Sequence, residues 1–169
     1  MPELDLIRLE RDRRVRVDDR IAADSPTWAD TGLRFDGPVE VRLEAQLSGA
    51  DVVVRGRFHA RIETECRRCL APMLVDVDES VSLVFKSGLG RAEAEWEEVY
   101  PLPAGARTLA LAEPLREHVL LAAPQYPLCQ ETCRGLCPRC GANLNEGECG
   151  CGSTGGDERW AELRRVRFD

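Results

Sequence analysis

Eight cysteines fall into four close pairs along a chain of 169 residues. One pair lies in CRRCL, and the other three lie in the C-terminal stretch LCQETCRGLCPRCGANLNEGECGC. Four thiolates at such spacings can surround one metal ion as a tetrahedron, and Zn²⁺ is the metal most often bound in this way. The spacing therefore predicts two zinc sites that together use all eight cysteines.

The most specific pair is the one in CPRCG. Pro138 presets one dihedral angle of a tight turn, and Gly141 accepts the left-handed conformation that follows. Such a turn points backbone N–H groups at the thiolates. The pair in CGC comes next, with both sulfurs on the same side of an extended segment. We expect site 1 to consist of these two pairs, Cys137, Cys140, Cys149 and Cys151.

Site 2 would hold the remaining cysteines, Cys66, Cys69, Cys129 and Cys133. The grouping stays open, because four pairs can combine in three ways. A loop of 59 residues separates Cys69 from Cys129, and closing it costs only about 2 kcal/mol more than closing the short loop of site 1. Structural zinc supplies about 10–16 kcal/mol in small peptides. Site 2 would therefore tie the C-terminal segment to the rest of the chain.

Three other interpretations of the cysteines remain open. The cysteines could serve only as small buried hydrophobic residues, but such residues would not cluster at this spacing. A disulfide scaffold is typical of secreted chains, whereas the first thirty residues lack the apolar run of an export signal, so we expect a cytoplasmic protein. An iron–sulfur cluster would have a different spacing. Four thiolates complete the shell of a zinc ion, so we expect both sites to be structural.

Strands in which apolar and polar residues alternate would position the first cysteine pair. From Val39 to Leu47, apolar residues alternate with polar ones, which is typical of a half-buried strand. SGAD then predicts a hairpin turn, and Gly56 in the returning strand suggests a bulge. A third strand runs from Met73 to Lys86, so CRRCL would replace an ordinary hairpin loop. The returning strand would bury Val52, Val54, Phe58, Ala60 and Ile62.

One main helix is predicted from about Ala112, with Pro114 in its first turn and Pro124 beyond its end. The expected fold class is α+β, an antiparallel β-meander or barrel-like sheet packed by this helix. Residues 1–127 would form the core, and residues 128–169 a docked zinc-binding segment with a short C-terminal helix. We expect a solvated strand or loop at residues 1–20 and a connecting loop at residues 91–98.

The net charge of −7 opposes non-specific binding to nucleic acid. Any contact with RNA must use a local basic patch or a protein partner. Arg67 and Arg68 lie in CRRCL and have no acidic residue facing them. They are therefore better candidates to contact phosphate than the arginines of the central strand. Arg134 and Arg139, beside the other cysteines, could extend that patch.

The arginines of the central strand have a different interpretation. If the hairpin pairs about SGAD, Glu44 lies opposite Arg55 and Glu40 lies opposite His59. A salt-bridged ladder would then use much of their charge. No nucleophile triad, phosphate-binding glycine loop or nucleotide fingerprint occurs in the sequence, and we therefore predict no enzymatic activity.

Several stretches together resemble one protein family. CRRCL after an arginine-rich strand, a REHVLLAAP helix, PLCQETCRGLCPRCGANLNEGECGC and DERWAEL are similar to the YceD-like family, the large ribosomal RNA subunit accumulation proteins. The resemblance covers roughly residues 35 to 165. It implies a non-enzymatic bacterial or plastid factor that supports the processing or accumulation of large-subunit ribosomal RNA. The implied partners are the RNA precursor or ribosomal proteins, with no small-molecule substrate and no membrane.

Two functions from other classes remain open. A redox-sensitive chaperone could release zinc when its thiolates are oxidised and then expose apolar surface. A zinc-ribbon adaptor in transcription would bind a polymerase in place of ribosomal precursors. Both depend on the same predicted zinc sites.

Overall fold

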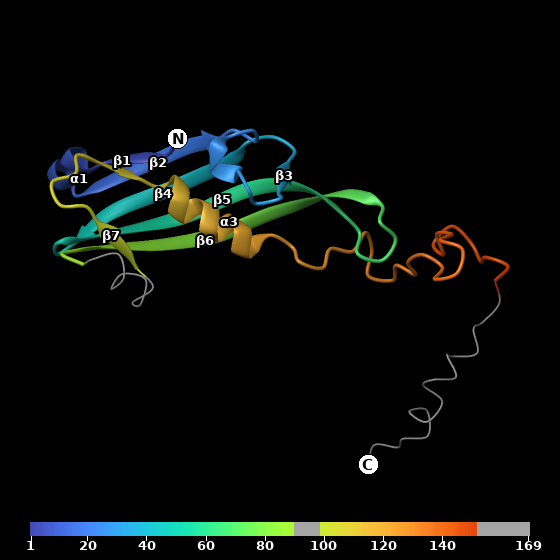
Figure 1. Ribbon diagram of the computed structural model, residues 1–169. Coiled ribbons are helices and arrows are strands. Elements are labelled where there is room, and N and C mark those ends of the chain that lie inside the picture. The colour runs from blue at the N-terminus through green and yellow to red at the C-terminus, as the bar shows by residue number, and fades with distance from the viewer. Residues whose placement is uncertain (90–98, 152–169) are drawn as a thin grey trace, which may run out of the picture.

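The computed structural model describes residues 1–89 and 99–151. Its main body is a six-stranded sheet in which five strands follow the order β2-β4-β5-β6-β7 and β3 also pairs with β5, while β1 and β8 form a separate two-stranded sheet. Helix α3 crosses one face of the large sheet (Figure 1). The elements are β1 (Glu3–Asp5), α1 (Leu6–Asp12), β2 (Arg14–Ile21), η1 (Pro26–Trp28), β3 (Arg34–Phe35), β4 (Val39–Ser48), β5 (Asp51–Glu65), β6 (Pro72–Ser87), β7 (Tyr100–Leu102), β8 (Thr108–Ala110) and α3 (Ala112–Ala122).

Strands β4, β5 and β6 form the antiparallel meander that the alternating pattern predicts. The turn between β4 and β5 follows the pair Ser48–Asp51, as expected from SGAD. All five residues predicted to face inward from β5 are buried. Strands β5 and β6 are the two longest strands. The turn that joins them, the β5–β6 knuckle, therefore lies beyond the end of the sheet, next to the Cys-rich segment that contains the last six cysteines (Figure 1).

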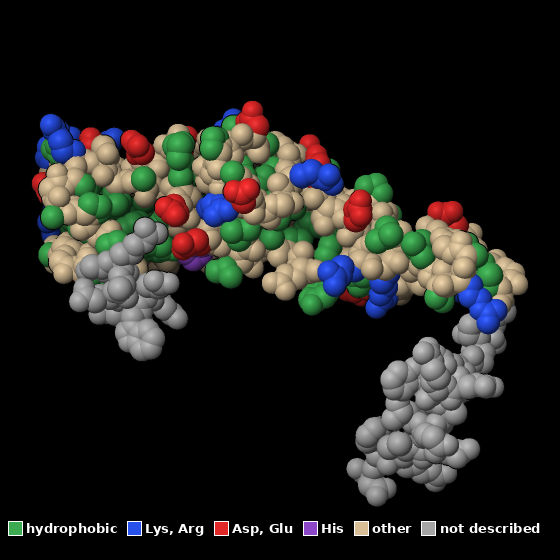
Figure 2. Space-filling view, viewed as in Figure 1, with side chains coloured by type: hydrophobic (Ala, Val, Ile, Leu, Met, Phe, Trp, Pro, Cys, Tyr) green, Lys and Arg blue, Asp and Glu red, His purple; other side chains and the backbone are tan. Residues whose placement is uncertain are grey.

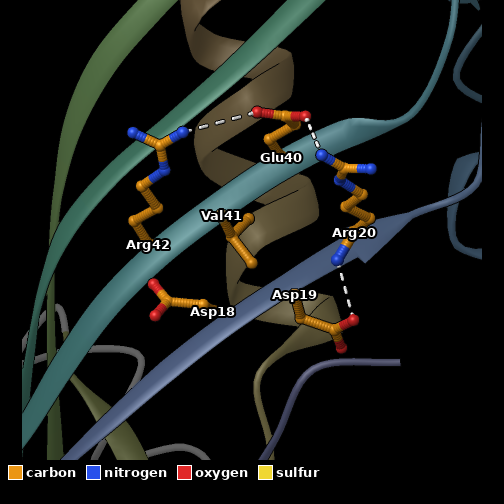
Figure 3. A pocket seen from close by; sticks show the side chains of 6 residues that line it. All are labelled: Asp18, Asp19, Arg20, Glu40, Val41 and Arg42. Atoms are coloured by element: carbon orange, nitrogen blue, oxygen red, sulfur yellow. Dashed lines mark hydrogen bonds and ion pairs between the residues drawn. The ribbon is translucent and has the colours of Figure 1, made fainter.

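The outer face of the meander carries a ladder of ion pairs. Glu44 lies opposite Arg55 and Glu40 lies opposite His59, in the predicted register. The ion pairs have other partners, however: the Glu44 carboxylate pairs with Arg14 and Arg16 of β2, and His59 lies 3.3 Å from Asp76 of β6. Figure 3 shows a depression on β2 and β4 where the Glu40 carboxylate meets Arg20 Nη2 at 3.0 Å and Arg42 Nη2 at 3.8 Å. The arginines of this depression are therefore already paired with a carboxylate.

Gly56 lies in regular pairing with Leu43 on one side and Val81 on the other, so the expected bulge is wrong. A Cβ atom at this position would overlap the carbonyl oxygen of Arg42. The glycine is therefore needed because strands β4 and β5 approach closely, and not because the strand is interrupted.

Helix α3 begins at Ala112, as the position of Pro114 predicts. Leu115 and Val119 are buried in the core against the sheet. The hydroxyl group of Tyr100 in β7 donates a 2.6 Å hydrogen bond to Glu117, and this bond attaches the helix to the edge strand. Within the described residues, no helix has the length and apolar character needed to cross a membrane.

Three expectations about the fold need correction. The sheet does not close into a barrel, because β2 and β7 lie at opposite ends of its strand order. It is not purely antiparallel, since β7 pairs with β6 in parallel. Residues 1–20 contain helix α1 and two strands, and not only a solvated strand or loop. The loop expected at residues 91–98 and the C-terminal helix fall outside the described residues.

Candidate metal centre

The β5–β6 connection is a tight knuckle that carries Cys66 and Cys69. The N–H group of Cys66 donates to the carbonyl oxygen of Ala71 at 2.9 Å. The N–H group of Leu70 donates to the carbonyl oxygen of Cys66 at 2.9 Å. Leu70 has a φ of 59°, the left-handed conformation that a glycine adopts more easily. These bonds hold both cysteine side chains at the end of the hairpin, where both are buried.

The C-terminal segment packs on this knuckle through backbone contacts. The Arg67 N–H group donates to the carbonyl oxygen of Pro127 at 2.9 Å, and the Leu136 N–H group donates to that of Arg68 at 3.1 Å. Gly135 has a φ of 76°, and a Cβ atom there would lie 3.0 Å from the Arg68 carbonyl oxygen. The chain between Pro127 and Leu136 is therefore fixed against the end of the sheet.

Site 2 forms where these two parts of the chain meet. Its four sulfur atoms, from Cys66, Cys69, Cys129 and Cys133, all lie within 4.8 Å of one another. The Sγ atoms of Cys66 and Cys133 are 3.7 Å apart, and those of Cys69 and Cys129 are 3.6 Å apart. Zinc–sulfur bonds of about 2.3 Å in a tetrahedron place two sulfurs about 3.8 Å apart. The spacing fits a metal ion, and it is far longer than a disulfide bond of about 2.05 Å.

Site 1 lies within the C-terminal segment itself. The sulfur atoms of Cys137, Cys140, Cys149 and Cys151 also lie within 4.8 Å of one another. Its knuckle repeats the local structure of the β5–β6 knuckle. The Cys137 N–H group donates to the carbonyl oxygen of Ala142 at 2.8 Å, and the Gly141 N–H group donates to the carbonyl oxygen of Cys137 at 2.9 Å. Gly141 has a φ of 74°, so the left-handed conformation predicted for CPRCG is confirmed.

The surroundings of the sulfurs favour ionisation of Cys66 and Cys133 in site 2 and of Cys137 in site 1. Backbone N–H groups, first that of Cys129 and then that of Cys69, lower the pKa of Cys66 to about 6. The N–H groups of Cys140 and Arg139 likewise lower the pKa of Cys137 to about 6. Conversely, hydrogen bonding to Cys69 raises the pKa of Cys129 to about 12. Without a cation, neighbouring sulfurs share protons, whereas a divalent metal would stabilise all four thiolates.

Asn145 connects the two groups of cysteines, and the spacing analysis did not single it out. Its Nδ2 atom donates to the sulfur of Cys133 at 3.3 Å, and its Oδ1 atom accepts the Arg134 N–H group at 2.7 Å. Asn145 thus lies in the loop of site 1 and contacts a sulfur of site 2. The only signal in the sequence is an amide residue in NLN between two cysteine pairs, which does not reveal its partner.

The four arginines proposed to contact RNA or protein lie around these sites in different environments. The Arg67 guanidinium lies over the ring of Tyr126, with Cζ 4.6 Å from the ring centroid. Arg68 Nη1 donates to the Cys133 carbonyl oxygen at 2.8 Å. Arg134 approaches Glu148 at 3.9 Å, and Arg139 Nη1 donates to the Cys151 carbonyl oxygen at 3.0 Å. Figure 2 shows basic side chains along the lower edge of the narrow part that extends beyond the sheet.

Chemically, each group of cysteines could complete the shell of one tetrahedral ion. Four sulfur ligands leave no coordination position for a water molecule or a substrate. Hydrogen bonds from Arg139 N–H to the Cys137 sulfur at 3.4 Å and from Asn145 to Cys133 would orient the thiolates. The arrangement suits a structural metal centre more than a catalytic one.

The chain is similar to one known protein family and to several individual proteins. A family model described as large ribosomal RNA subunit accumulation protein YceD matches residues 54–167. A protein of Mycobacterium tuberculosis that carries no assigned function is 32% identical over 134 residues, which cover 79% of this chain and 62% of the relative. A Mycobacterium bovis protein shows the same identity and coverage.

A plant protein shares a weaker similarity. The Arabidopsis thaliana protein named large ribosomal RNA subunit accumulation protein YCED homolog 1, chloroplastic, is 24% identical over 156 residues, covering 77% of this chain and 49% of the relative. The chain thus spans less than two thirds of the length of these curated relatives. No solved structure matches it. Because the family model covers most of the chain, including both groups of cysteines, the protein belongs to the YceD family.

Proposed function

We propose that each group of four cysteines binds one structural Zn²⁺ ion. The observation that carries this proposal is the approach of four sulfurs to within 4.8 Å of one another at two separate places. All-cysteine ligation with tight knuckles is typical of zinc. The ion in site 2 would hold the Cys-rich segment on the end of the β5–β6 hairpin, and the ion in site 1 would give that segment its own shape.

The function that this arrangement supports best is a non-enzymatic role in the cytoplasm, in the assembly of the large ribosomal subunit. Membership of the YceD family supports a role related to ribosome biogenesis, and the plant relative is named for the accumulation of large ribosomal RNA. The four arginines around the zinc sites would contact the RNA precursor or a ribosomal protein. Zinc would act by keeping this surface rigid, without taking part in a reaction.

Complementation tests the function and the role of the metal together. Deletion of the gene in its own organism is expected to lower the ratio of large to small ribosomal subunits in a sucrose gradient and the level of mature large-subunit RNA. The intact chain should restore both, whereas a Cys66→Ser, Cys69→Ser variant should restore neither. Normal subunit and RNA levels in the deletion strain would refute the proposed function. Full rescue by the variant would refute only the role of site 2.

A further inference from the structure

We propose that Arg67 and Tyr126 form a platform on which an unpaired base of single-stranded RNA stacks, with the adjacent phosphates bound by the guanidinium groups of Arg67 and Arg68. This inference rests on the proposed function, and it names both the contact surface and the class of RNA. Tyr126 was not among the residues singled out in the sequence.

The two side chains contact each other as a cation–π pair. The Arg67 guanidinium lies 4.6 Å above the Tyr126 ring centroid, and its Nη1 atom donates to the Gln125 carbonyl oxygen at 3.5 Å. Tyr126 is nevertheless 72% exposed, and Arg67 is also exposed. A planar cation over an aromatic ring offers a flat polarisable surface, and bases stack on aromatic rings and guanidinium planes alike.

The backbone on both sides of the stack is fixed by site 2. Arg67 directly follows Cys66, and its N–H group bonds Pro127 at 2.9 Å. Tyr126 directly precedes Pro127 and lies three residues before Cys129, the next cysteine of the same site. Because the two segments meet at one group of sulfurs, the stack needs little further ordering when a ligand binds.

The charges of Arg67 and Arg68 are not neutralised by a carboxylate. Neither guanidinium forms an ion pair within residues 1–89 and 99–151, and their hydrogen bonds go to backbone carbonyl oxygens. Arg57 on the outer face of the sheet, by contrast, pairs with Asp78 at 3.0 Å. Exposed guanidinium groups without a carboxylate partner are suited to phosphate.

Leu70 adds an exposed apolar side chain to the same knuckle. Its left-handed φ of 59° is the conformation that the knuckle turn requires, as Gly141 shows in site 1 with a φ of 74°. Its side chain is 57% exposed. Leu70 thus offers apolar surface three residues along the knuckle from Arg67.

Single-stranded RNA supplies a partner for each of these features, namely a flat base for the stack and phosphates for the two arginines. Duplex RNA keeps its bases stacked inside the helix and unavailable to Tyr126. The net charge of −7 opposes long-range attraction of any nucleic acid, so affinity must come largely from stacking. With about two phosphates bound, the slope of log K against log salt should be shallow, about −1.4.

Fluorescence anisotropy with the zinc-loaded full chain tests this proposal. The probes are a labelled 12-nucleotide single-stranded RNA of mixed sequence and the same RNA annealed to its complement. The single strand should bind more tightly than the duplex. Tyr126→Ala should weaken its binding by about 5- to 150-fold, as expected for the loss of one stacked base. Tyr126→Phe, which retains the ring, should stay within about twofold of the parent chain.

Arg67→Lys separates planarity from charge, because lysine keeps the charge but cannot stack as a plane. It should weaken binding by about fivefold or more while leaving the shallow salt slope unchanged. Unchanged zinc content in every variant shows that site 2 is intact. Absence of binding by the parent chain, a preference for the duplex, or equal binding by Tyr126→Ala would each overturn the proposal.

A protein partner gives a different result. If association with large-subunit particles requires Tyr126 yet persists after ribonuclease treatment, the platform binds a protein and the RNA proposal is wrong. The outcome for the proposed function is read separately. A Tyr126→Ala chain that binds no RNA but restores normal ribosomal RNA levels refutes the platform's role alone, whereas normal RNA levels in the deletion strain refute the function itself.

Discussion

The Arg68 guanidinium donates from Nη1 to the carbonyl oxygen of Cys133 at 2.8 Å, which joins residues 65 positions apart in the chain. The Arg68 carbonyl oxygen also accepts the N–H group of Leu136 at 3.1 Å. One residue of the β5–β6 knuckle therefore holds the loop that carries two cysteines of site 2. The contact joins the two segments that supply the four sulfurs of site 2, so it should help to position these ligands.

Arg68→Ala should lower the zinc affinity of site 2 by about tenfold, the lower end of the range for groups that position metal ligands. The measurement is competition with a chromophoric chelator in a Cys149→Ser, Cys151→Ser background, in which only site 2 is complete. Arg139→Ala is the matched control, because Arg139 contacts Cys151 of site 1. Equal affinities for the Arg68→Ala variant and its parent would show that the contact does not support the site.

Gly56→Ala should destabilise the sheet by about 1–3 kcal/mol, the usual cost of forcing an extra group into packed structure. The new Cβ atom would meet the backbone of Arg42, which cannot move without disturbing the pairing of β4 and β5. Denaturant unfolding followed by circular dichroism measures the loss. Gly150→Ala, where a Cβ atom meets nothing within 4 Å, should change stability much less. An equal effect of both substitutions would contradict the close approach.

Tyr100 should make the attachment of helix α3 sensitive to alkaline pH. Burial, and then the hydrogen bond to Glu117, raises the pKa of Tyr100 above its ordinary value of 10.0. Because the folded state disfavours the phenolate, this contribution is full below pH 10 and is lost as the pH rises through the raised pKa. Tyr100→Phe should therefore lose less stability than the parent between pH 9 and 11 in denaturant titrations. Parallel declines of the two proteins would contradict the assignment.

Removal of metal should loosen the Cys-rich segment while leaving the sheet folded. The sheet has a large apolar core, whereas the buried cluster around site 2 consists of three cysteines and few other apolar residues. Hydrogen exchange after chelation should show lost protection at residues 127–151 and retained protection in β4 and β5. Readdition of zinc should restore the protection. Retained protection throughout the segment without metal would show that sulfur–metal bonds do not shape it.

The sequence predicted best those features that depend on neighbouring residues. The alternation in β4 and β5 directly reflects burial on one face, so strand positions, inward residues and the pairing of Glu44 with Arg55 all follow from it. Pro114 likewise marked the start of helix α3. Each of these signals lies within a few residues along the chain.

Features that depend on contacts between distant segments could not be predicted. Helix α1 is capped by Asp5 and packs Leu6 and Leu9 into the core, but its dense charges obscured that face. The spacing of the cysteines left three groupings open. Cys129 approaches Cys69 across 60 residues of sequence, where the Arg67–Pro127 backbone bond joins the same two segments. Gly56 suggested a bulge because a sequence does not distinguish a close approach of strands from an interruption.

The most direct test of the central claim is the metal content of the purified native protein, measured by mass spectrometry together with a thiol titration. Two zinc ions per chain are expected, one for each group of four sulfurs. The Cys66→Ser, Cys69→Ser variant and the Cys149→Ser, Cys151→Ser variant should each retain one. A metal-free chain with eight reactive thiols and a folded Cys-rich segment would contradict the claim that metal holds this segment on the β5–β6 hairpin.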